Sequence, residues 1–407
     1  MRGLSFGLDF AAGLPAVSGR IAGNNVAYAI GDSRTRATAS PAGGYNQRYP
    51  LTVARQLCAG QMDLPYPNIQ GVAGYTPQQI YDNLFADALA SAADTLIVLA
   101  GTNTLGSNPA ANAAMIADMA AEWTASSPSR VIHVLDETPW GGTSGDEAGH
   151  QTLRDAIRSL SDPAGGVYVV GSWRAITGGD DGITPLADSY RDDLHFAIPG
   201  STRVGRALAE SLLAALPVRD FHGRATALAQ SFSLGTLAAN DMTSNSSITT
   251  GTVSTSMVTH EGETWLQVEL AGVTGAVNLY RSSSGIPAGW VAGTTLFESN
   301  IDFILRAGHT NVRRLGLYGM KQSGAPNPHY STGVGVGDGE HGGGADDAID
   351  LSYPDGLELR GTLWTPRLRL AADATQLRPW WVSFASRTSL PASATLLLRR
   401  PQCRVID

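Results

Sequence analysis

The residues best suited to chemistry in this sequence are a serine and a histidine that lie far apart along the chain. Ser33 ends the tripeptide Gly31-Asp32-Ser33, directly after an apolar run, and a serine hydroxyl becomes a nucleophile when a base takes its proton. The first 218 residues hold three histidines: His133, His150 and His195. Only His195 follows an aspartate, Asp192, by three residues in Asp-Asp-Leu-His. A carboxylate at that spacing can hold the imidazole tautomer and stabilise the imidazolium, so this set of residues suits acyl transfer.

Two other segments can supply hydrogen-bond donors to such a reaction. Acyl transfer places negative charge on the carbonyl oxygen, where each preorganised donor is worth about 3–4 kcal/mol. Gly74 precedes an expected helix, and a glycine lets the backbone come close to a ligand. Asn103 follows another apolar run in Gly101-Thr102-Asn103 and offers a side-chain amide. Both are therefore candidates for an oxyanion hole.

The elements that must position these residues alternate between strand and helix as far as about residue 218. Four apolar runs predict short buried strands: residues 26–30, 95–100, 131–135 and 167–170. Proline is favoured at the first position of a helix. It opens the helices expected from Pro50, Pro77, Pro109 and Pro199. This alternation predicts right-handed crossovers and a parallel sheet covered on both faces. The carboxyl ends of parallel strands share one edge, so the candidate residues are expected to meet there.

From about Phe221 the helical period disappears, and short stretches rich in Thr, Val, Leu and Trp follow. The clearest of them are residues 264–270, 276–280, 361–370 and 394–399. Separated by Gly, Ser and Pro turns, they predict an antiparallel β-sandwich or jelly roll. The chain is therefore expected to divide into an amino-terminal arm (1–22), an α/β domain (23–218) and a β domain (219–407).

Composition excludes several classes of function. The formal charge is −8 with only 16% charged residues, so no basic stripe for nucleic acid is expected. No apolar run approaches the roughly 20 residues that span a bilayer, and no attached secretory signal is visible. Neither a metal nor a cofactor is expected, because no His or Cys cluster has ligand spacing. Cys58 and Cys403 are interpreted as inert thiols. The acidic stretch 335–347 is expected to be a solvated loop rather than a calcium site.

The four motifs, in this order, resemble those of the SGNH (GDSL-like) hydrolase family over about residues 25–215. The resemblance implies a three-layer α/β/α, flavodoxin-like fold. It implies that Ser33 is the nucleophile, with its own N–H, the Gly74 N–H and the Asn103 amide as the oxyanion hole. It also implies that Asp192 orients His195, the base. The departures from the family pattern suggest a remote member and leave the substrate open: Arg34, Ile69, Thr104, Asp193 and Phe196-Ala197.

The function implied is a serine esterase acting on short acyl esters, above all acetyl esters, through an acyl-enzyme and without a cofactor. The expected partner is an acylated small molecule or a polysaccharide. Five tryptophans lie in the β half: Trp265, Trp290, Trp364, Trp380 and Trp381. Exposed, they would stack on sugars and indicate a carbohydrate deacetylase; buried, they would fill the core.

The resemblance also bears on where the protein acts. Similar hydrolases with β domains occur in secreted deacetylases and phage tail proteins, which suggests an extracellular or virion-associated location; an oligomer is possible. Two alternatives stay open. One is an adhesin or phage virion component with an inactive hydrolase scaffold, and the other is a lipase-like esterase for longer acyl chains.

Overall fold

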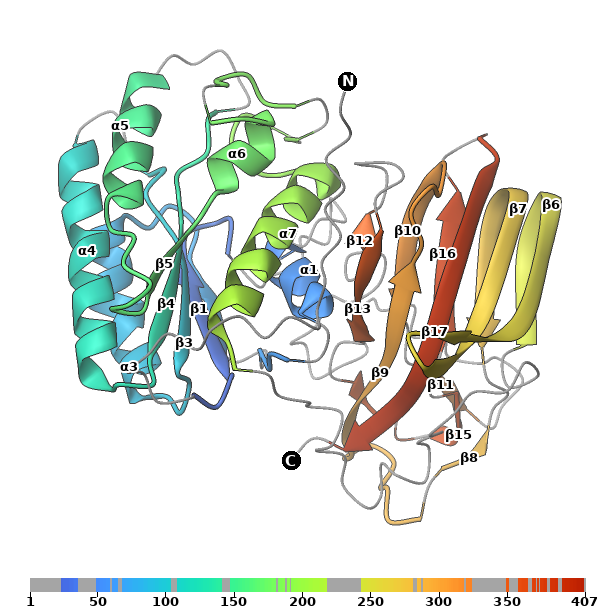
Figure 1. Ribbon diagram of the computed structural model, residues 1–407. Helices are drawn as coiled ribbons and strands as arrows, with labels where there is room; N and C mark the ends of the chain where they lie inside the picture. Colours follow the sequence, from blue (N-terminus) through green and yellow to red (C-terminus); the bar gives the residue numbers. More distant parts are fainter. Residues whose placement is uncertain are drawn as a thin grey trace.

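A computed structural model shows an α/β part and a β part side by side (Figure 1). The residues it describes are 23–35, 49–58, 61–64, 68–103, 108–140, 147–180, 182–186, 189–190, 192–217, 243–280, 284–286, 288–317, 320–323, 349–350, 358–364, 368–370, 372, 374–378, 381–386 and 390–405. The expected arm (1–22) and acidic loop (335–347) lie outside these residues. Within the described ranges, no helix combines the length and the apolar character needed to cross a membrane.

The α/β part is built on a five-stranded parallel sheet. Its strands are β1 (Ala27–Gly31), β2 (Ile69–Gly71), β3 (Thr95–Leu99), β4 (Val131–Leu135) and β5 (Val167–Val170), in the order β2-β1-β3-β4-β5. The four predicted strands are confirmed to within a residue or two. Every residue of β1, β3 and β4 is buried, as expected of parallel strands covered on both faces. The sequence analysis missed β2, which has three half-buried residues and no apolar run.

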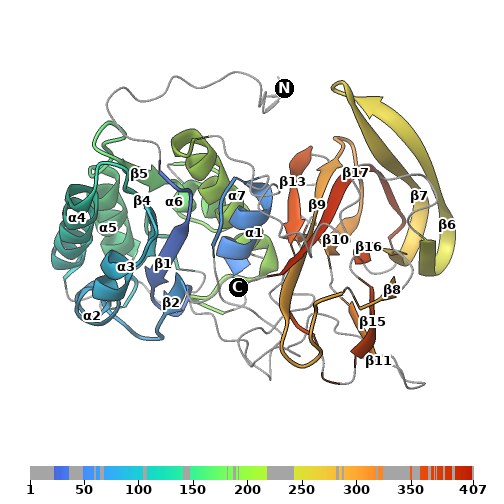
Figure 2. The same ribbon diagram turned by 90° about the horizontal axis from the view of Figure 1, so that it is seen from below.

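Helices cover both faces of this sheet, so the expected three-layer fold is confirmed (Figures 1 and 2). One face carries α2 (Pro77–Ile80), the π-helical turn η2 (Tyr81–Phe85), α3 (Ala86–Ala90), α4 (Pro109–Ser126) and α5 (Glu147–Arg158). The other carries α1 (Tyr49–Leu57), α6 (Ser172–Thr177) and α7 (Ile198–Ala215). Thr76 caps α2 in a capping box with Gln79, and the Asn108 side chain caps α4, as their positions before proline favour.

The carboxyl-terminal part is an antiparallel β domain, as predicted. Its larger sheet has the order β12-β10-β16-β7-β17-β9-β13, with β14 on β9 and β6 on β7. The bounds are β6 (Thr243–His260), β7 (Glu263–Tyr280), β9 (Leu296–Leu305), β10 (Val312–Leu317), β12 (Ile349–Asp350), β13 (Leu359–Trp364), β14 (Leu368–Arg369), β16 (Trp381–Ser386) and β17 (Ala392–Val405). A second sheet pairs β11 (Met320–Ser323), β15 (Ala374–Arg378) and β8 (Ser284–Gly285) in that order.

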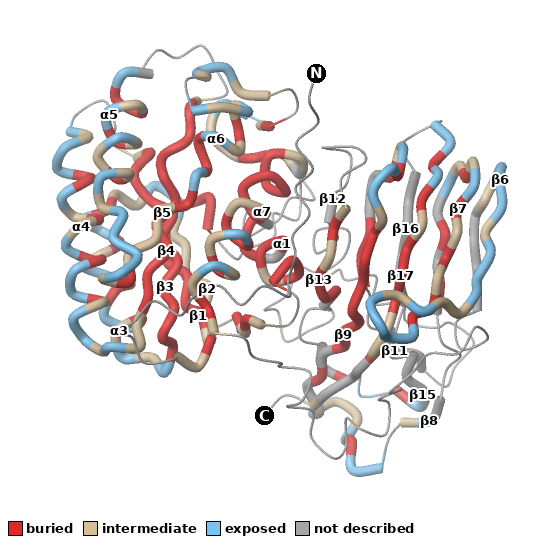
Figure 3. The backbone as a smooth tube through the Cα atoms, in the orientation of Figure 1, coloured by how far each residue is buried: buried red, intermediate tan, exposed pale blue. Residues whose placement is uncertain are grey.

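The larger sheet is curved. Strand β10 is separated from β9, β13 and β17 in the strand order, yet it contacts all three. Inward-facing side chains such as Phe303, Leu315 and Leu396 form the core that these strands enclose. Figure 3 shows this buried interior against β6, whose described residues are exposed or half-buried. The antiparallel domain is thus confirmed, whereas the jelly-roll topology stays a prediction.

Helix α1 joins the two parts. It packs on α7 on one side and on β13 on the other (Figure 2). The approach to β13 is so close that a Cβ at Gly361 would collide with the Gln56 carbonyl oxygen. Apolar residues of both parts form one continuous buried cluster. The change from helix to strand falls between α7 and β6, in residues 218–242 outside the described ranges, so the bounds of the domains stay a prediction.

Candidate active site

The carboxyl ends of three neighbouring strands place the candidate residues at one edge of the sheet. In register, Gly31 at the end of β1 pairs with Gly71 of β2 and Leu99 of β3. The next residues continue the ladder: the Val72 N–H donates to the Gly31 carbonyl and the Asp32 N–H to the Leu99 carbonyl. The segments that carry Gly74, Ser33 and Asn103 therefore leave the sheet at the same level.

Ser33 occupies a tight turn directly after β1. The Thr35 N–H donates to the Asp32 carbonyl at 3.1 Å, and the Arg34 N–H donates to the Asp32 side chain at 2.9 Å. A Cβ at Gly31 would collide with the Leu99 carbonyl and the Thr35 side chain, so this position before the turn requires glycine. Only 6% of the Ser33 surface is exposed. The turn therefore holds the Ser33 hydroxyl in an almost fully buried position.

The structure brings His195 to this hydroxyl from 162 residues away. The His195 Nε2 atom lies 2.9 Å from the Ser33 Oγ atom. On the other side of the ring, Nδ1 lies 3.0 and 3.1 Å from the two carboxylate oxygens of Asp192. If Nδ1 carries the proton and donates it to Asp192, Nε2 is left as the acceptor for the serine hydroxyl. The three groups form a continuous hydrogen-bonded chain.

Asp192 is the aspartate that faces the ring, while the adjacent Asp193 is exposed. One Asp192 oxygen also accepts the backbone N–H groups of Leu194 and His195, at 2.9 and 2.6 Å. Partial burial raises the pKa of Asp192, but these N–H groups and the imidazole outweigh it and lower the pKa to about 2. The carboxylate is therefore ionised at neutral pH, in the state that can stabilise an imidazolium.

Gly74 and Asn103 lie on two segments that are bonded to each other at this edge of the sheet. Gly74 is exposed in the turn after β2 with φ of 81°, a conformation that favours glycine. The Asn103 Nδ2 group donates to the carbonyl of Tyr75, the next residue, at 2.9 Å. This bond ties the segment after β3 to the turn after β2. Both candidate donors thus belong to one surface at the edge where Ser33 lies.

The sequence analysis missed two supports of this edge. Asn112 is buried on α4, and its side-chain Nδ2 donates to the Gly101 carbonyl at 3.1 Å. It therefore holds the segment that carries Asn103. Glu137, two residues after β4, forms an ion pair with the Arg34 side chain. Its place after an apolar run at the same edge was the available signal, but nothing in the sequence indicated its partner.

The other two histidines of the α/β part, His133 and His150, are fully buried. His133 lies in β4, stacked on Tyr168, with Nδ1 2.8 Å from the Ser211 hydroxyl. Burial lowers the pKa of His133 to about 3, so it is a neutral core residue. His150 lies on α5 with its Nδ1 3.6 Å from Glu137 Oε1. Cys58 is a buried free thiol whose pKa burial raises.

Two of the five tryptophans can be placed, and both are buried. The Trp265 ring packs under the Arg399 guanidinium and donates to the His260 carbonyl. Trp290 packs against Phe297. The side chains of Trp364, Trp380 and Trp381 lie outside the described residues. For Trp265 and Trp290 the structure therefore gives a core role rather than a sugar-stacking surface.

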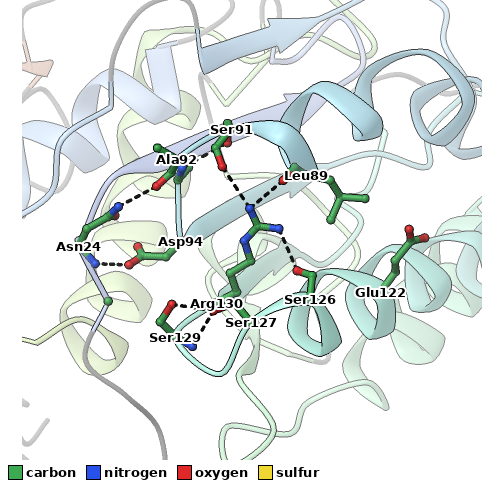
Figure 4. Close-up of a pocket in the computed structure, with 12 residues that line it drawn as sticks. Asn24, Leu89, Ser91, Ala92, Asp94, Glu122, Ser126, Ser127, Ser129 and Arg130 are labelled. Carbon is green, nitrogen blue, oxygen red and sulfur yellow. Dashed lines mark hydrogen bonds between the residues drawn. The ribbon is translucent and has the colours of Figure 1, made fainter.

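A pocket of about 760 Å³ lies at the opposite edge of the sheet, where β3 and β4 begin (Figure 4). The Arg130 guanidinium there donates to the carbonyls of Leu89 and Ser91 and to the Ser126 hydroxyl. Asp94 accepts the Asn24 N–H. These polar groups bond to one another, and none of the candidate catalytic residues lines the pocket. The candidate catalytic residues lie at the other edge, after the carboxyl ends of β1, β2 and β3.

Comparison with known proteins identifies the α/β part. Residues 29–203 match the model of the GDSL-like lipase/acylhydrolase family. The chain therefore contains a GDSL-like hydrolase domain, and the resemblance to the SGNH (GDSL-like) family is confirmed over this range. No curated protein matches the sequence.

Several solved structures are similar to this half of the chain. A protein described as a GDSL-like lipase from Parabacteroides merdae is 18% identical, with a TM-score of 0.39, and the match covers 49% of this chain and 100% of that one. A catalytic mutant of an acetylxylan esterase from Geobacillus stearothermophilus is 14% identical, with a TM-score of 0.37, covering 49% and 100%. A protein described as a platelet activating factor from Streptococcus pneumonia is 19% identical, with a TM-score of 0.37, covering 48% and 87%.

Proposed function

We propose that the protein is a serine esterase that hydrolyses short-chain acyl esters, above all acetyl esters. The observation that carries this proposal is the hydrogen-bonded chain from the Ser33 hydroxyl through His195 to Asp192, with 2.9 Å between Oγ and Nε2 and 3.0 Å between Nδ1 and Asp192 Oδ2. It lies within a GDSL-like lipase/acylhydrolase domain. A nucleophile, its base and an orienting carboxylate in this order are the arrangement that acyl transfer needs.

The reaction would proceed in two steps. In the first, His195 takes the Ser33 proton as Oγ attacks the ester carbonyl, and it then gives that proton to the departing alcohol, leaving an acyl-enzyme. In the second, His195 takes a proton from water as the water oxygen attacks the acyl carbon, and returns it to Ser33 as the acid leaves. The N–H groups of Ser33 and Gly74 and the Asn103 amide would donate to the oxyanion in both steps.

We further propose that the alcohol part of the substrate is a carbohydrate, so that the enzyme removes acetyl groups from a polysaccharide or an acylated small sugar. This part of the proposal depends on the β domain, whose remaining candidate sugar-stacking residues are Trp364, Trp380 and Trp381. The burial of Trp265 and Trp290 removes two of the five residues that favoured it. A polysaccharide substrate would agree with an extracellular or virion-associated site of action.

The test compares wild type with Ser33→Ala for release of p-nitrophenol from its acetate, and of acetate from acetylated xylan. We expect hydrolysis of both substrates that depends on Ser33. Equal rates for the two proteins would contradict the esterase and favour an adhesin or virion component with an inactive scaffold. Faster hydrolysis of the decanoate than of the acetate ester would favour a lipase. Activity on p-nitrophenyl acetate without activity on acetylated xylan would contradict the carbohydrate part alone.

A further inference from the structure

The residue after the nucleophile is a fully buried arginine. Neither the Arg34 side chain nor its two carboxylate partners, Asp32 and Glu137, has any exposed surface. Burying three charged side chains costs several kcal/mol for each ion before their mutual attraction is counted, and an apolar side chain of similar volume often stabilises a fold as well. Stability alone therefore gives a weak reason for an arginine here.

The guanidinium uses all of its donors. Nε and Nη2 donate to the two oxygens of Asp32 at 3.1 and 2.8 Å. Nη1 and Nη2 donate to the two oxygens of Glu137 at 2.7 and 3.2 Å, and Nη1 also lies 3.4 Å from the Thr138 hydroxyl. The planar fork of an arginine can bridge two carboxylates in this way, and a lysine cannot. Arg34 thus fixes the orientation of both carboxylates.

One of these carboxylates shapes the nucleophile turn. The Asp32 oxygen that accepts the Arg34 Nε–H also accepts the Arg34 backbone N–H at 2.9 Å, closing a ring around Ser33. The orientation of the Asp32 side chain therefore constrains the backbone on both sides of Ser33. That backbone carries the hydroxyl that lies 2.9 Å from His195 Nε2.

The other carboxylate connects this turn to the rest of the edge. Glu137 follows β4, and its Oε2 atom would lie 3.3 Å from a Cβ placed on Gly101, at the start of the segment that carries Asn103. The His150 ring on α5 lies on its other side. Burial raises the pKa of Glu137, but the Arg34 guanidinium and the His150 ring outweigh it and lower the pKa to about 2. The ion pair with Arg34 is therefore present throughout the neutral range.

We propose that Arg34 is a positioning residue for the reaction: clamped between Asp32 and Glu137, it holds the Ser33 turn in register with His195 and with the segment of Asn103. This inference rests on the proposed esterase function. Because its side chain has no exposed surface, Arg34 acts through the turn and not by contact with the substrate.

The experiment measures kcat and KM for p-nitrophenyl acetate in Arg34→Met, Arg34→Lys, Glu137→Gln and a control variant. Circular dichroism measures the folded fraction of each variant. The control is Arg158→Met. It breaks the ion pairs of Arg158 with Asp136, at 2.7 Å, and with Asp180, at 3.0 Å. Asp136 precedes Glu137 by one residue, and neither pair includes a residue of the Ser33 turn. If Arg34→Met does not fold, Glu137→Gln replaces it; glutamine keeps the shape but has one acceptor oxygen in place of the two that Arg34 uses.

We expect kcat per folded molecule to fall by about 10- to 100-fold in Arg34→Met, with KM within about twofold of wild type. Arg34→Lys should recover part of the loss, and Arg158→Met should retain the wild-type kcat. A wild-type kcat in folded Arg34→Met (or in its replacement), or an equal loss in Arg158→Met, would overturn the inference and leave the esterase intact.

A second measurement tests the role of Arg34 independently of esterase activity. If wild type shows no hydrolysis that depends on Ser33, the esterase proposal fails, and a crystal structure of the Arg34 variant decides the inference. Separation of Ser33 Oγ from His195 Nε2 beyond about 3.5 Å would support the positioning role. Retention of the hydrogen bond in that variant would overturn it.

Discussion

The two sides of the candidate catalytic centre differ in their exposure to solvent. On the nucleophile side, the side chains of Asp32, Arg34 and Glu137 have no exposed surface. On the base side, 22% of the His195 side chain and 46% of the Asp192 side chain are exposed. Buried charges must be paired permanently because water cannot replace a lost partner, whereas solvent screens exposed ones. Substitutions on the base side should therefore change activity alone, and those on the nucleophile side should change stability as well.

The largest effect is expected on the base side. His195→Gln removes the group that takes the Ser33 proton, so kcat should fall by about 10⁴- to 10⁶-fold. The ring is partly exposed, so the free energy of unfolding should change by less than about 1 kcal/mol. Steady-state kinetics and urea unfolding measure the two quantities. A loss of several kcal/mol in stability would remove the distinction between the two sides.

The orienting carboxylate should give the next largest effect. Asp192→Asn keeps the shape but no longer selects the tautomer with a proton on Nδ1, so kcat should fall by about 10³- to 10⁴-fold. Its neighbour provides a matched control, since the exposed Asp193 does not face the ring, and Asp193→Asn should leave kcat within about twofold. Equal losses in the two variants would show that the role of Asp192 has been misassigned.

Stability should respond most on the nucleophile side. Glu137→Gln leaves the Arg34 charge with one carboxylate in a buried site and should cost about 3 kcal/mol of unfolding free energy. The folded-state pKa is lowered from 4.5 to about 2, so the contribution of Glu137 is present above about pH 4.5 and is lost as the pH falls towards 2. The gap between wild type and variant should shrink over that window in chemical unfolding. A gap that stays constant would contradict an ionised Glu137.

The smallest expected effect is on the pH dependence of stability, where the buried His133 should differ from the partly exposed His195. The folded-state pKa of His133 is lowered from 6.5 to about 3, so the unfolded chain binds the proton first and stability falls as the pH drops below about 6.5. At pH 5 this amounts to about 2 kcal/mol relative to pH 8. His133→Gln should remove that part of the pH dependence, whereas His195→Gln should leave most of it. Identical pH profiles for wild type and His133→Gln would contradict a neutral buried ring.

Much of the α/β part could be predicted because its signals are local. Runs buried on both faces, such as residues 95–99 and 131–135, mark strands, and proline after a capping residue marks the start of α2 and α4. The missed elements lack such signals. Strand β2 has three residues, and β6 is rich in Thr and Ser with few apolar side chains because both of its faces are largely exposed.

The motif residues are also local features, and parallel topology implied that Ser33, Asn103 and His195 would share an edge. Gly74 was a candidate by its motif, but the strand before it, β2, has no local signal. Spacing along the chain could not specify which residues distant in the sequence would pair with each other. Arg34 was visible as an unusual residue after the nucleophile, but its pairing with Glu137, 103 residues away, exists only once β1 and β4 lie in the same sheet. The burial of Trp265 and the neutral state of His133 likewise follow from packing, because the surroundings of a side chain decide its solvation and the charges that face it.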